Sequence, residues 1–397
     1  MKIYPLKGIK LASICSGMYR RKRLDLSILE LPVNTVVSAV FTKNKARSST
    51  IDFSSKNLKK KSPKYLIINS GNANAGTGKY GMLDIKEYCN VLAKITNCKV
   101  NDILAFSTGI IGERVAVNKI CKSLPKLYKN LNEKNWTNFA KSIMTTDTQP
   151  KIFSKRIKIN KEWITVTGVA KGSGMIKPNM ATMLSFIATD MNIDKIALSK
   201  IQKEATKKSF NMISVDGETS TNDASLIIST GESRISFKKL TKKQKENFSN
   251  IICEAHTQLA KMIIKDGEGA TKFITIKVNK CSTFNEAKNI AMSVGNSLLV
   301  KTALFAQDPN WGRIISAIGN VEIKAKDINR YTISFGKSIV FKNGCKAKNY
   351  DEKKLLKYLR NKEIDINICC NSGSKEATVW TSDLTYQYIK INAEYRT

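Results

Sequence analysis

A Thr-Gly pair that follows an apolar run is the first candidate for chemistry in this 397-residue chain. Thr108 and Gly109 come just after residues 103–106, which predict a strand, and they belong to a loop that extends to Gly112. A threonine hydroxyl and an accessible backbone N–H can together stabilise a negative charge that develops on oxygen. An ordinary turn at the end of a strand has the same composition, and this loop taken alone favours the turn.

Two other loops come close to phosphate-binding sequences without matching them. Residues 70–78 are followed by Lys79, but Ala73 stands where a P-loop requires glycine and Tyr80 replaces its Ser or Thr. Residues 171–177 lack the third glycine of a dinucleotide-binding fingerprint. Both segments therefore predict a loop whose backbone closely approaches a ligand or another part of the chain. Neither segment has the sequence of a P-loop or of a dinucleotide-binding loop.

Carboxylates accompany glycine in two further loops, residues 216–223 and 266–269. Loops of this kind bind an amine, a metal ion or only their own backbone. The oxygen ligands of the first loop do not have the spacing of a calcium-binding loop. No metal site is therefore expected here.

The single histidine limits the bases that the chain can offer to a nucleophile. His256 lies in a helical pattern in which Phe248, Ile252 and Leu259 recur at spacings of three and four. It is therefore expected to be a core or flanking residue. A Ser-His-Asp triad would depend on this one residue, so a nucleophile here is expected to use another base.

Cysteine usage indicates the compartment. The nine cysteines are odd in number, irregularly spaced and without a CxxC pair. This pattern predicts reduced thiols in a cytoplasmic protein and argues against both a disulfide framework and a zinc site.

The net charge of +35 raises the possibility of a nucleic-acid partner. Dense basic runs occur at residues 20–23, 59–64 and 238–245, but most Lys and Arg residues are spread along the whole chain, which favours solvated faces. No stretch approaches 18 uninterrupted apolar residues, so no membrane span is predicted. Lysines near the start also interrupt any apolar signal segment.

The elements that must position these loops are short strands mixed with helices. Strands are predicted at residues 36–41, 65–69, 103–106, 364–370 and 377–384, and alternation over 163–169 predicts a half-buried strand. Helices are predicted from Asp194 to about residue 209, from after Thr241 to about 266, and over 351–359. The pattern lacks regular βαβ periodicity and therefore favours an α+β fold.

A series of short motifs runs in order along nearly the whole chain. They occupy residues 39–44, 69–78, 107–112, 144–148, 168–183, 215–223, 266–272, 308–313 and 392–397. Together they resemble the glutamate N-acetyltransferase/ornithine acetyltransferase family of arginine biosynthesis. No single motif would be specific, but the whole set in register is.

The resemblance implies self-cleavage inside the motif Lys-Pro-Asn-Met-Ala-Thr-Met, here residues 177–183. The cut would fall between Ala181 and Thr182, and Thr182 would become the N-terminal nucleophile of a second chain. The α-amine released there has an ordinary pKa of about 7.7–8.0 and is suited to act as a base near neutral pH. A base supplied by the α-amine agrees with a chain whose single histidine is not expected to act as the base.

The resemblance implies the remaining site residues as well. Thr108 and Gly109 would form the oxyanion hole for the scissile peptide and for the acetyl donor. Substrate contacts would be made by Thr148, Lys171, Thr182, Glu268, Asn392 and Thr397. Lys171 can pair with a substrate α-carboxylate, and we infer that Glu268 receives the cationic amine of ornithine.

The implied reaction is a ping-pong acetyl transfer. Thr182 takes the acetyl group of N2-acetylornithine, ornithine leaves, and the acetyl-threonyl enzyme passes the group to glutamate. No cofactor or metal is implied, and the sequence leaves open whether acetyl-CoA serves as a further acetyl donor. Residues 114–117 and Gly76 depart from the family's pattern, which bears on substrate range.

The implied fold is an αββα-layered core of the self-cleaving N-terminal-nucleophile type, with a smaller C-terminal α/β domain at roughly residues 281–397. Residues 1–181 would form an α chain and residues 182–397 a β chain, assembled as a heterotetramer of two of each. A cytoplasmic location without specific nucleic-acid or membrane partners is expected.

Two other functions stay open at this point. An aminopeptidase or amidohydrolase of the same fold also self-cleaves and would use water as the acceptor, so acetate release would identify it. A basic nucleic-acid-binding protein would bind duplex DNA with a steep dependence on salt. Agreement of the motifs around Lys171, Glu268 and the C-terminus favours acetyl transfer.

Overall fold

The computed structural model describes residues 2–19, 21–177, 183–322 and 328–395. Three of the predicted site residues, Ala181, Thr182 and Thr397, lie outside these ranges. No helix in the described ranges is both long enough and apolar enough to cross a membrane. All nine cysteines are free thiols.

The first sheet has four strands in the order β1-β2-β4-β5. Its strands are β1 (Lys10–Ile14), β2 (Leu26–Glu30), β4 (Tyr65–Asn69) and β5 (Ile103–Ser107). The helices around it are α1 (Ser49–Lys60), α2 (Gly78–Thr96), α3 (Val117–Lys129) and α4 (Trp136–Ser142). Strands β4 and β5 are parallel, with Asn69 opposite Ser107, so the loops that follow them leave the same edge of the sheet.

The second sheet has five strands in the order β3-β10-β8-β7-β6. Its strands are β3 (Val36–Phe41), β6 (Lys151–Ile159), β7 (Glu162–Lys171), β8 (Leu184–Thr189) and β10 (Ala224–Ser229). Leu184 pairs with both Lys171 and Ala224. The end of β7 and the starts of β8 and β10 therefore lie side by side.

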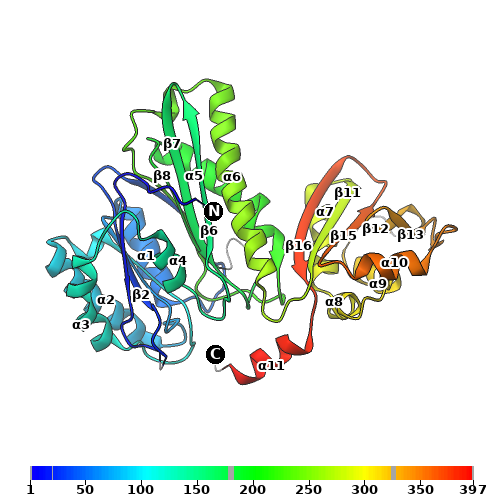
Figure 1. Ribbon diagram of the computed structural model, residues 1–397, viewed down its shortest axis with the longest axis horizontal. Coiled ribbons are helices and arrows are strands. Elements are labelled where there is room, and N and C mark those ends of the chain that lie inside the picture. The colour runs from blue at the N-terminus through cyan, green and yellow to red at the C-terminus, as the bar shows by residue number, and fades with distance from the viewer. Residues whose placement is uncertain (1, 20, 178–182, 323–327, 396–397) are drawn as a thin grey trace.

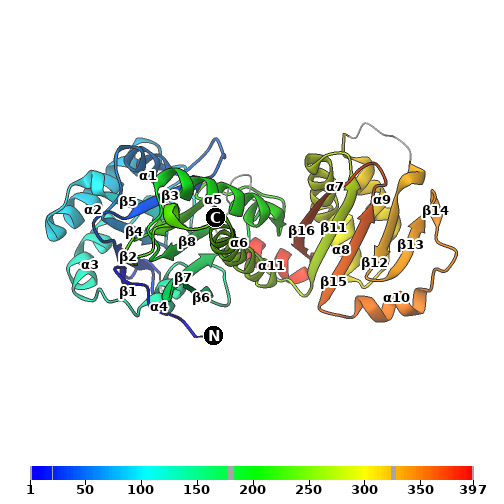
Figure 2. The ribbon, with the colours of Figure 1, turned by 90° about the horizontal axis from the view of Figure 1, so that it is seen from above.

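The two sheets pack face to face between helices. Between them lies a core that includes Phe106, Phe186 and Phe139, with the rings of Phe106 and Phe186 5.3 Å apart edge to face. Helices α2 and α3 cover the outer face of the first sheet, and α5 (Lys195–Lys208) and α6 (Lys242–Lys265) cover that of the second. The layers are visible in Figures 1 and 2. The predicted αββα core is confirmed.

Strand β7 is buried more deeply than its alternating sequence suggests. From Ile164 to Ala170 every residue is buried, so the prediction of a half-buried strand is wrong. The strand lies inside the second sheet, with Val169 facing the core between the sheets and Val166 facing the helices. Its polar residues are satisfied internally, since the Thr167 hydroxyl donates to the carbonyl of Tyr4 at 2.9 Å.

The predicted helix starts are confirmed by their caps. The Asp194 carboxylate accepts the N–H of Ala197 at 2.9 Å, immediately before α5. Thr241 and Gln244 form a capping box at the start of α6. The same helix ends at Lys265, and its C-cap residue Asp266 takes part in the contacts around the site.

A seven-stranded sheet in the order β14-β13-β12-β15-β11-β16-β9 builds the C-terminal unit. Its strands are β9 (Ile213–Ser214), β11 (Phe273–Cys281), β12 (Thr332–Phe335), β13 (Ser338–Lys342), β14 (Cys345–Lys346), β15 (Glu363–Cys369) and β16 (Lys375–Ser382). Its helices are α7 (Phe284–Asn296), α8 (Leu298–Phe305), α9 (Trp311–Gly319) and α10 (Glu352–Leu359). Strand β11 pairs with β15 on one side and β16 on the other and so lies inside this sheet, and the domain boundary near residue 281 stays a prediction.

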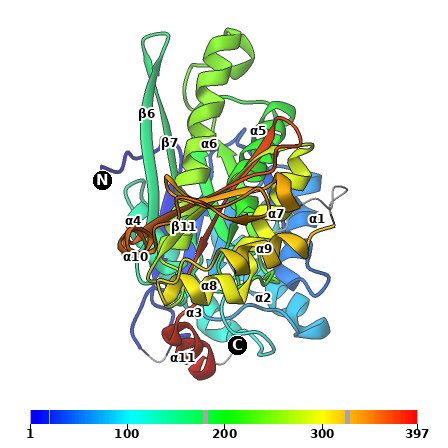
Figure 3. The ribbon, with the colours of Figure 1, turned by 90° about the vertical axis from the view of Figure 1, so that its right-hand side faces the viewer.

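The last helix, α11 (Tyr386–Glu394), leaves this unit and returns to the core. In Figures 1 and 3 it lies below the C-terminal sheet, on the side of the first two sheets. None of its residues is fully buried. It is held instead by polar contacts such as that of the Thr385 hydroxyl, which donates to the Gly269 carbonyl at 2.8 Å.

His256 is fully buried on α6 beside the ring of Phe210, as the helical pattern predicts. Its Nδ1 lies 2.8 Å from the carbonyl oxygen of Ile252, and Nε2 has no partner among the described residues. Burial lowers the pKa of this imidazole to about 4, although the bond to Ile252 acts in the opposite direction. His256 is a neutral core residue and is not among the residues that line the pocket described below.

The lowered pKa of His256 predicts that stability falls on acidification. The imidazole has a pKa near 6.5 in the unfolded chain. The stability that the folded protein gains by keeping His256 neutral is therefore complete above pH 6.5 and is lost as the pH falls toward 4. The loss should reach about 3 kcal/mol, at 1.36 kcal/mol per pKa unit. Unfolding of the wild type and of His256→Leu, followed between pH 7.5 and 4, should show a steeper decline in the wild type. Equal slopes would contradict the prediction.

Candidate active site

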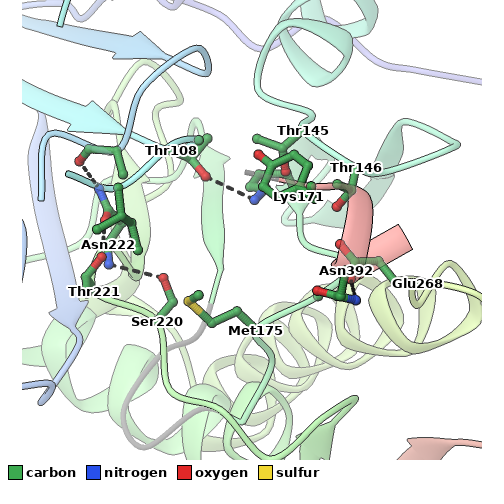
Figure 4. Close-up of a pocket in the computed structure, with 15 residues that line it drawn as sticks. Thr108, Thr145, Thr146, Lys171, Met175, Ser220, Thr221, Asn222, Glu268 and Asn392 are labelled. Atoms are coloured by element: carbon green, nitrogen blue, oxygen red, sulfur yellow. Dashed lines mark hydrogen bonds between the residues drawn. The ribbon is translucent and has the colours of Figure 1, made fainter. Parts of the chain in front are cut away.

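The loops at the adjoining edges of the two core sheets form one pocket. Thr108 and Gly109 follow β5, Lys171 ends β7, and Asn222 precedes β10 (Figure 4). The complete lining consists of Ala73, Thr108, Gly109, Ile111, Thr145, Thr146, Lys171, Gly174, Met175, Ser220, Thr221, Asn222, Glu268, Asn392 and Tyr395. Four separate predicted site positions, Thr108–Gly109, Lys171, Glu268 and Asn392, are thus brought together.

Lys171 and Thr108 are in direct contact. The Lys171 ammonium donates to the Thr108 hydroxyl oxygen across 3.1 Å (Figure 4). Because this oxygen acts as an acceptor, the hydroxyl hydrogen is available to a further acceptor in the pocket. The arrangement suits stabilisation of an oxyanion, with a positive charge directly behind the donating hydroxyl.

Gly109 occupies a position that no other residue could take without rearrangement. Its φ is +126°, and an added Cβ would lie 2.8 Å from the Asn72 nitrogen and 3.0 Å from the Ser70 carbonyl oxygen. Both neighbours are backbone atoms of the loop after β4, which cannot move aside cheaply. The packing of the two loops and the positive φ therefore require glycine at position 109.

Asn222 ties the loops of the two sheets together. Its side-chain amide donates to the Ala73 carbonyl at 2.5 Å and to the Ser107 carbonyl at 2.9 Å. The next residue, Asp223, is buried, and burial raises its pKa well above the ordinary value. One of its carboxyl oxygens, Oδ2, has no hydrogen-bond partner in the described part of the chain. Asn222 and Asp223 are thus both buried where the chain enters β10.

A buried carboxylate stands behind Lys171. Asp147 accepts the N–H of Gly172 at 2.7 Å and the ammonium of Lys151 at 2.6 Å. Burial acts to raise its pKa, but Lys151 and Lys171 together lower it to about 2. Burial also lowers the pKa of Lys171, while Asp147, Asp223 and Glu268 oppose that shift. The charge of Asp147 therefore helps to keep the Lys171 ammonium protonated.

Lys151 links Asp147 to the end of α6. Its buried ammonium also lies 2.5 Å from Asp266, and Asp266 accepts the backbone N–H of Thr148 at 3.0 Å. The hydroxyl of Thr148 donates to the same carboxylate. Thr148 is exposed and does not line the pocket, where its neighbours Thr145 and Thr146 do. The predicted contact of Thr148 with the substrate stays a prediction.

The carboxylate of Glu268 lies against Gly174 in the pocket. A Cβ on Gly174 would lie 2.3 Å from a carboxylate oxygen of Glu268, so a larger residue at this position would displace the end of the Glu268 side chain. Glu268 accepts a hydrogen bond of 2.8 Å from the side-chain amide of Asn392, on α11 (Figure 4). The expectation that the end of the chain reaches the site therefore holds for Asn392.

The turn that contains Met175 and Ile176 is held by Asp216, a residue without a predicted role. Its carboxylate accepts the N–H groups of Met175 at 2.6 Å and Ile176 at 2.9 Å. It also accepts the Tyr388 hydroxyl of α11 at 3.3 Å. One carboxylate thus connects the loop after β7 with the last helix.

Several lining residues were not assigned roles from the sequence. They are Ala73, Ile111, Thr145, Thr146, Gly174, Met175, Ser220, Thr221, Asn222 and Tyr395. Each lies inside or next to a motif of the family resemblance, and that position was the signal by which the sequence could have indicated it. The type of side chain alone does not distinguish residues that line the pocket from residues that support it. No group of three or more His, Cys, Asp or Glu residues that could hold a metal ion is present in the described ranges.

Comparison with known proteins agrees with this geometry. Residues 10–397 match the sequence model of the ArgJ family. The chain is 42% identical to the arginine biosynthesis bifunctional protein ArgJ of Colwellia psychrerythraea, over 99% of this chain and 97% of that protein. It is 38% identical to the protein of the same name from Methylococcus capsulatus, over 100% and 97%.

A solved structure is also similar. The crystal structure of arginine biosynthesis bifunctional protein ArgJ from Bacillus halodurans aligns with a TM-score of 0.50 at 35% identity. The alignment covers 98% of that crystallised chain but 53% of this one.

Proposed function

The chain belongs to the ArgJ family and is an acetyltransferase of arginine biosynthesis, and from this premise we propose that it transfers the acetyl group of N2-acetylornithine to glutamate. The observation that carries this proposal is the pocket itself. Among the described residues its lining holds one ammonium, Lys171, and one carboxylate, Glu268, beside the Thr108–Gly109 pair. Such a pocket is complementary to an amino acid with a carboxylate and a separate ammonium.

The two charges divide the substrate between them. Lys171 binds the α-carboxylate, and Glu268, oriented by Asn392, binds the side-chain ammonium of ornithine. Thr148 and Thr397 complete the proposed set of substrate contacts. Thr397 lies outside the described residues. The Thr148 hydroxyl donates to Asp266, and its oxygen retains lone pairs that can accept a hydrogen bond from the substrate.

In the first half-reaction the Thr182 hydroxyl oxygen bonds to the acetyl carbonyl carbon of N2-acetylornithine. Thr108 and Gly109 stabilise the oxyanion. The amide C–N bond then breaks, and the hydroxyl proton passes through the α-amine of Thr182 to the leaving nitrogen. Ornithine departs, and the enzyme keeps the acetyl group as an ester of Thr182.

In the second half-reaction the α-amine of glutamate attacks the acetyl ester. The ester C–O bond breaks, a proton returns to the Thr182 oxygen, and N-acetylglutamate leaves. Because water would compete for the same ester, transfer requires that glutamate is positioned in the pocket before attack.

Self-cleavage between Ala181 and Thr182 is the step that would create the α-amine. The solved relative supports a mature enzyme of two chains, because nearly its whole crystallised chain corresponds to about half of this one. We further propose two α chains, residues 1–181, and two β chains, residues 182–397, in a heterotetramer. Sizing of the purified protein by light scattering would test that assembly.

The reaction is tested by incubating the purified protein with N2-acetylornithine and glutamate and identifying the products by mass spectrometry. Ornithine and N-acetylglutamate should form in equal amounts, and Thr182→Ala should form neither. Acetate in place of N-acetylglutamate would contradict the transferase and indicate the amidohydrolase. A parallel incubation with acetyl-CoA and glutamate tests the second donor.

A further inference from the structure

Arg23 of the basic run 20–23 contacts the backbone of a residue that lines the pocket, and it has no role in the proposed chemistry. Its guanidinium donates to the carbonyl oxygens of Met144 and Thr145, the latter across 3.1 Å. It also lies over the ring of Tyr19, 4.3 Å from the ring centroid. Thr145 lines the pocket, so Arg23 is attached directly to the pocket wall.

The segment that carries Arg23 is folded and not a solvated tail. Asp25 accepts the N–H groups of Ser16 at 2.6 Å and Met18 at 3.0 Å, which closes the loop between β1 and β2. The Tyr19 hydroxyl donates to the Ser70 carbonyl in the loop after β4. Arg23 is therefore held in a defined place, although its exposed neighbours Arg21 and Lys22 belong to the same basic run.

The charge of Arg23 is available to a ligand. It is half-buried and has no ion pair with any carboxylate in the described ranges. Two carbonyl contacts leave several of its five N–H groups uncommitted. Burial raises the pKa of Tyr395 to about 12, Tyr19 and Glu268 act in the same direction, and Arg23 opposes them. Arg23 and Glu268 thus influence the same pocket-lining ring.

The two amino acids that must bind in this pocket differ in the charge of their side chains. Ornithine carries an ammonium, for which Glu268 is the counter-charge. Glutamate carries a second carboxylate, which Glu268 would repel, and Lys171 is already paired with the α-carboxylate. Among the residues that the structure describes, the charged groups of the lining therefore suit ornithine and include no second positive charge for the side chain of glutamate.

We propose that Arg23 determines the specificity for glutamate by providing the positive charge that receives the side-chain carboxylate of the acceptor. The inference rests on the proposed function and adds to it a residue that acts in the second half-reaction. Arg23 and Glu268 then form two alternative counter-charges, one for each substrate. Ornithine gains little from Arg23, because its side chain has the same sign.

The test compares two acceptors in the same enzyme. With N2-acetylornithine as donor, kcat/KM is measured for glutamate and, by isotope exchange, for labelled ornithine. Arg23→Met should lower the glutamate-to-ornithine ratio about tenfold, the effect of one charge in a partly buried site. Arg23→Lys should keep the ratio near the wild-type value. Arg21→Met, which removes an exposed charge from the same run, is the matched control.

The glutamate-to-ornithine ratio of kcat/KM distinguishes a loss of specificity from a distorted pocket. A displaced Thr145 loop would slow the reactions of both acceptors and leave the ratio unchanged. An equal loss with both acceptors in Arg23→Met, or an equal change of the ratio in Arg21→Met, would overturn the inference. A wild-type enzyme that forms no N-acetylglutamate would refute the proposed function and this inference with it. An active wild type whose ratio is insensitive to Arg23 would refute the inference alone.

Discussion

Replacing Thr182 by alanine is expected to give a single uncut chain and to reduce acetyl transfer by roughly 10⁴-fold or more. The hydroxyl is proposed both to attack its own preceding peptide bond and to carry the acetyl group. Without it neither covalent intermediate can form, and the α-amine that serves as base is never released. A denaturing gel with intact mass measurement should show fragments 1–181 and 182–397 in the wild type only.

Thr182→Ser is the matched control for this experiment. Serine retains a hydroxyl and, after cleavage, an α-amine, so the variant should still be cut and should keep measurable activity. Cleavage of Thr182→Ala after Ala181 would contradict the role of the hydroxyl. An active wild type that stays uncut would remove the α-amine from the mechanism.

Removing the Thr108 hydroxyl is expected to lower kcat roughly 10²- to 10³-fold, the usual cost of one oxyanion-hole donor. Thr108→Val preserves the shape of the side chain but offers no hydrogen to the oxyanion. It also leaves the Lys171 ammonium without the acceptor that now lies 3.1 Å away. Because the oxyanion exists only in the transition state, KM should change much less than kcat, and self-cleavage should slow in parallel.

Thr108→Ser restores the hydroxyl and is expected to restore most of the rate of both processes. Steady-state kinetics on mature protein, together with a time course of cleavage, separates the two effects. A normal kcat in Thr108→Val would exclude the hydroxyl from the oxyanion hole. A rise confined to KM would place Thr108 in substrate binding instead.

The strands and helices near the site could largely be predicted from local sequence. The strand predicted at residues 65–69 is β4 itself, and Asp194 and Thr241 cap the helices that were predicted to follow them. These features depend on neighbouring residues, because capping and hydrophobic periodicity act over a few positions. The burial of β7 could not be predicted in the same way, since it depends on what covers each face of the sheet.

The charge of +35 has a different meaning in the structure. The net charge alone predicted only that the basic residues lie on solvent-exposed faces, and most of them fit that description. Arg23 is an exception, because Tyr19, Met144 and Thr145 hold it against the loop that carries the lining residue Thr145. No composition or run length distinguishes it from Arg21, which is exposed.

By itself the sequence determined the chemistry on offer: a Thr-Gly pair, an Ala-Thr motif, one lysine and one glutamate in glycine-rich loops, and one histidine unsuited to act as a base. Only the tertiary structure decided which of these groups meet. Asn392 reaches Glu268 across 124 positions, and Lys151 reaches Asp266 across 115. Contacts of that range follow from how sheets and helices pack, and packing is a property of the whole chain rather than of any short segment.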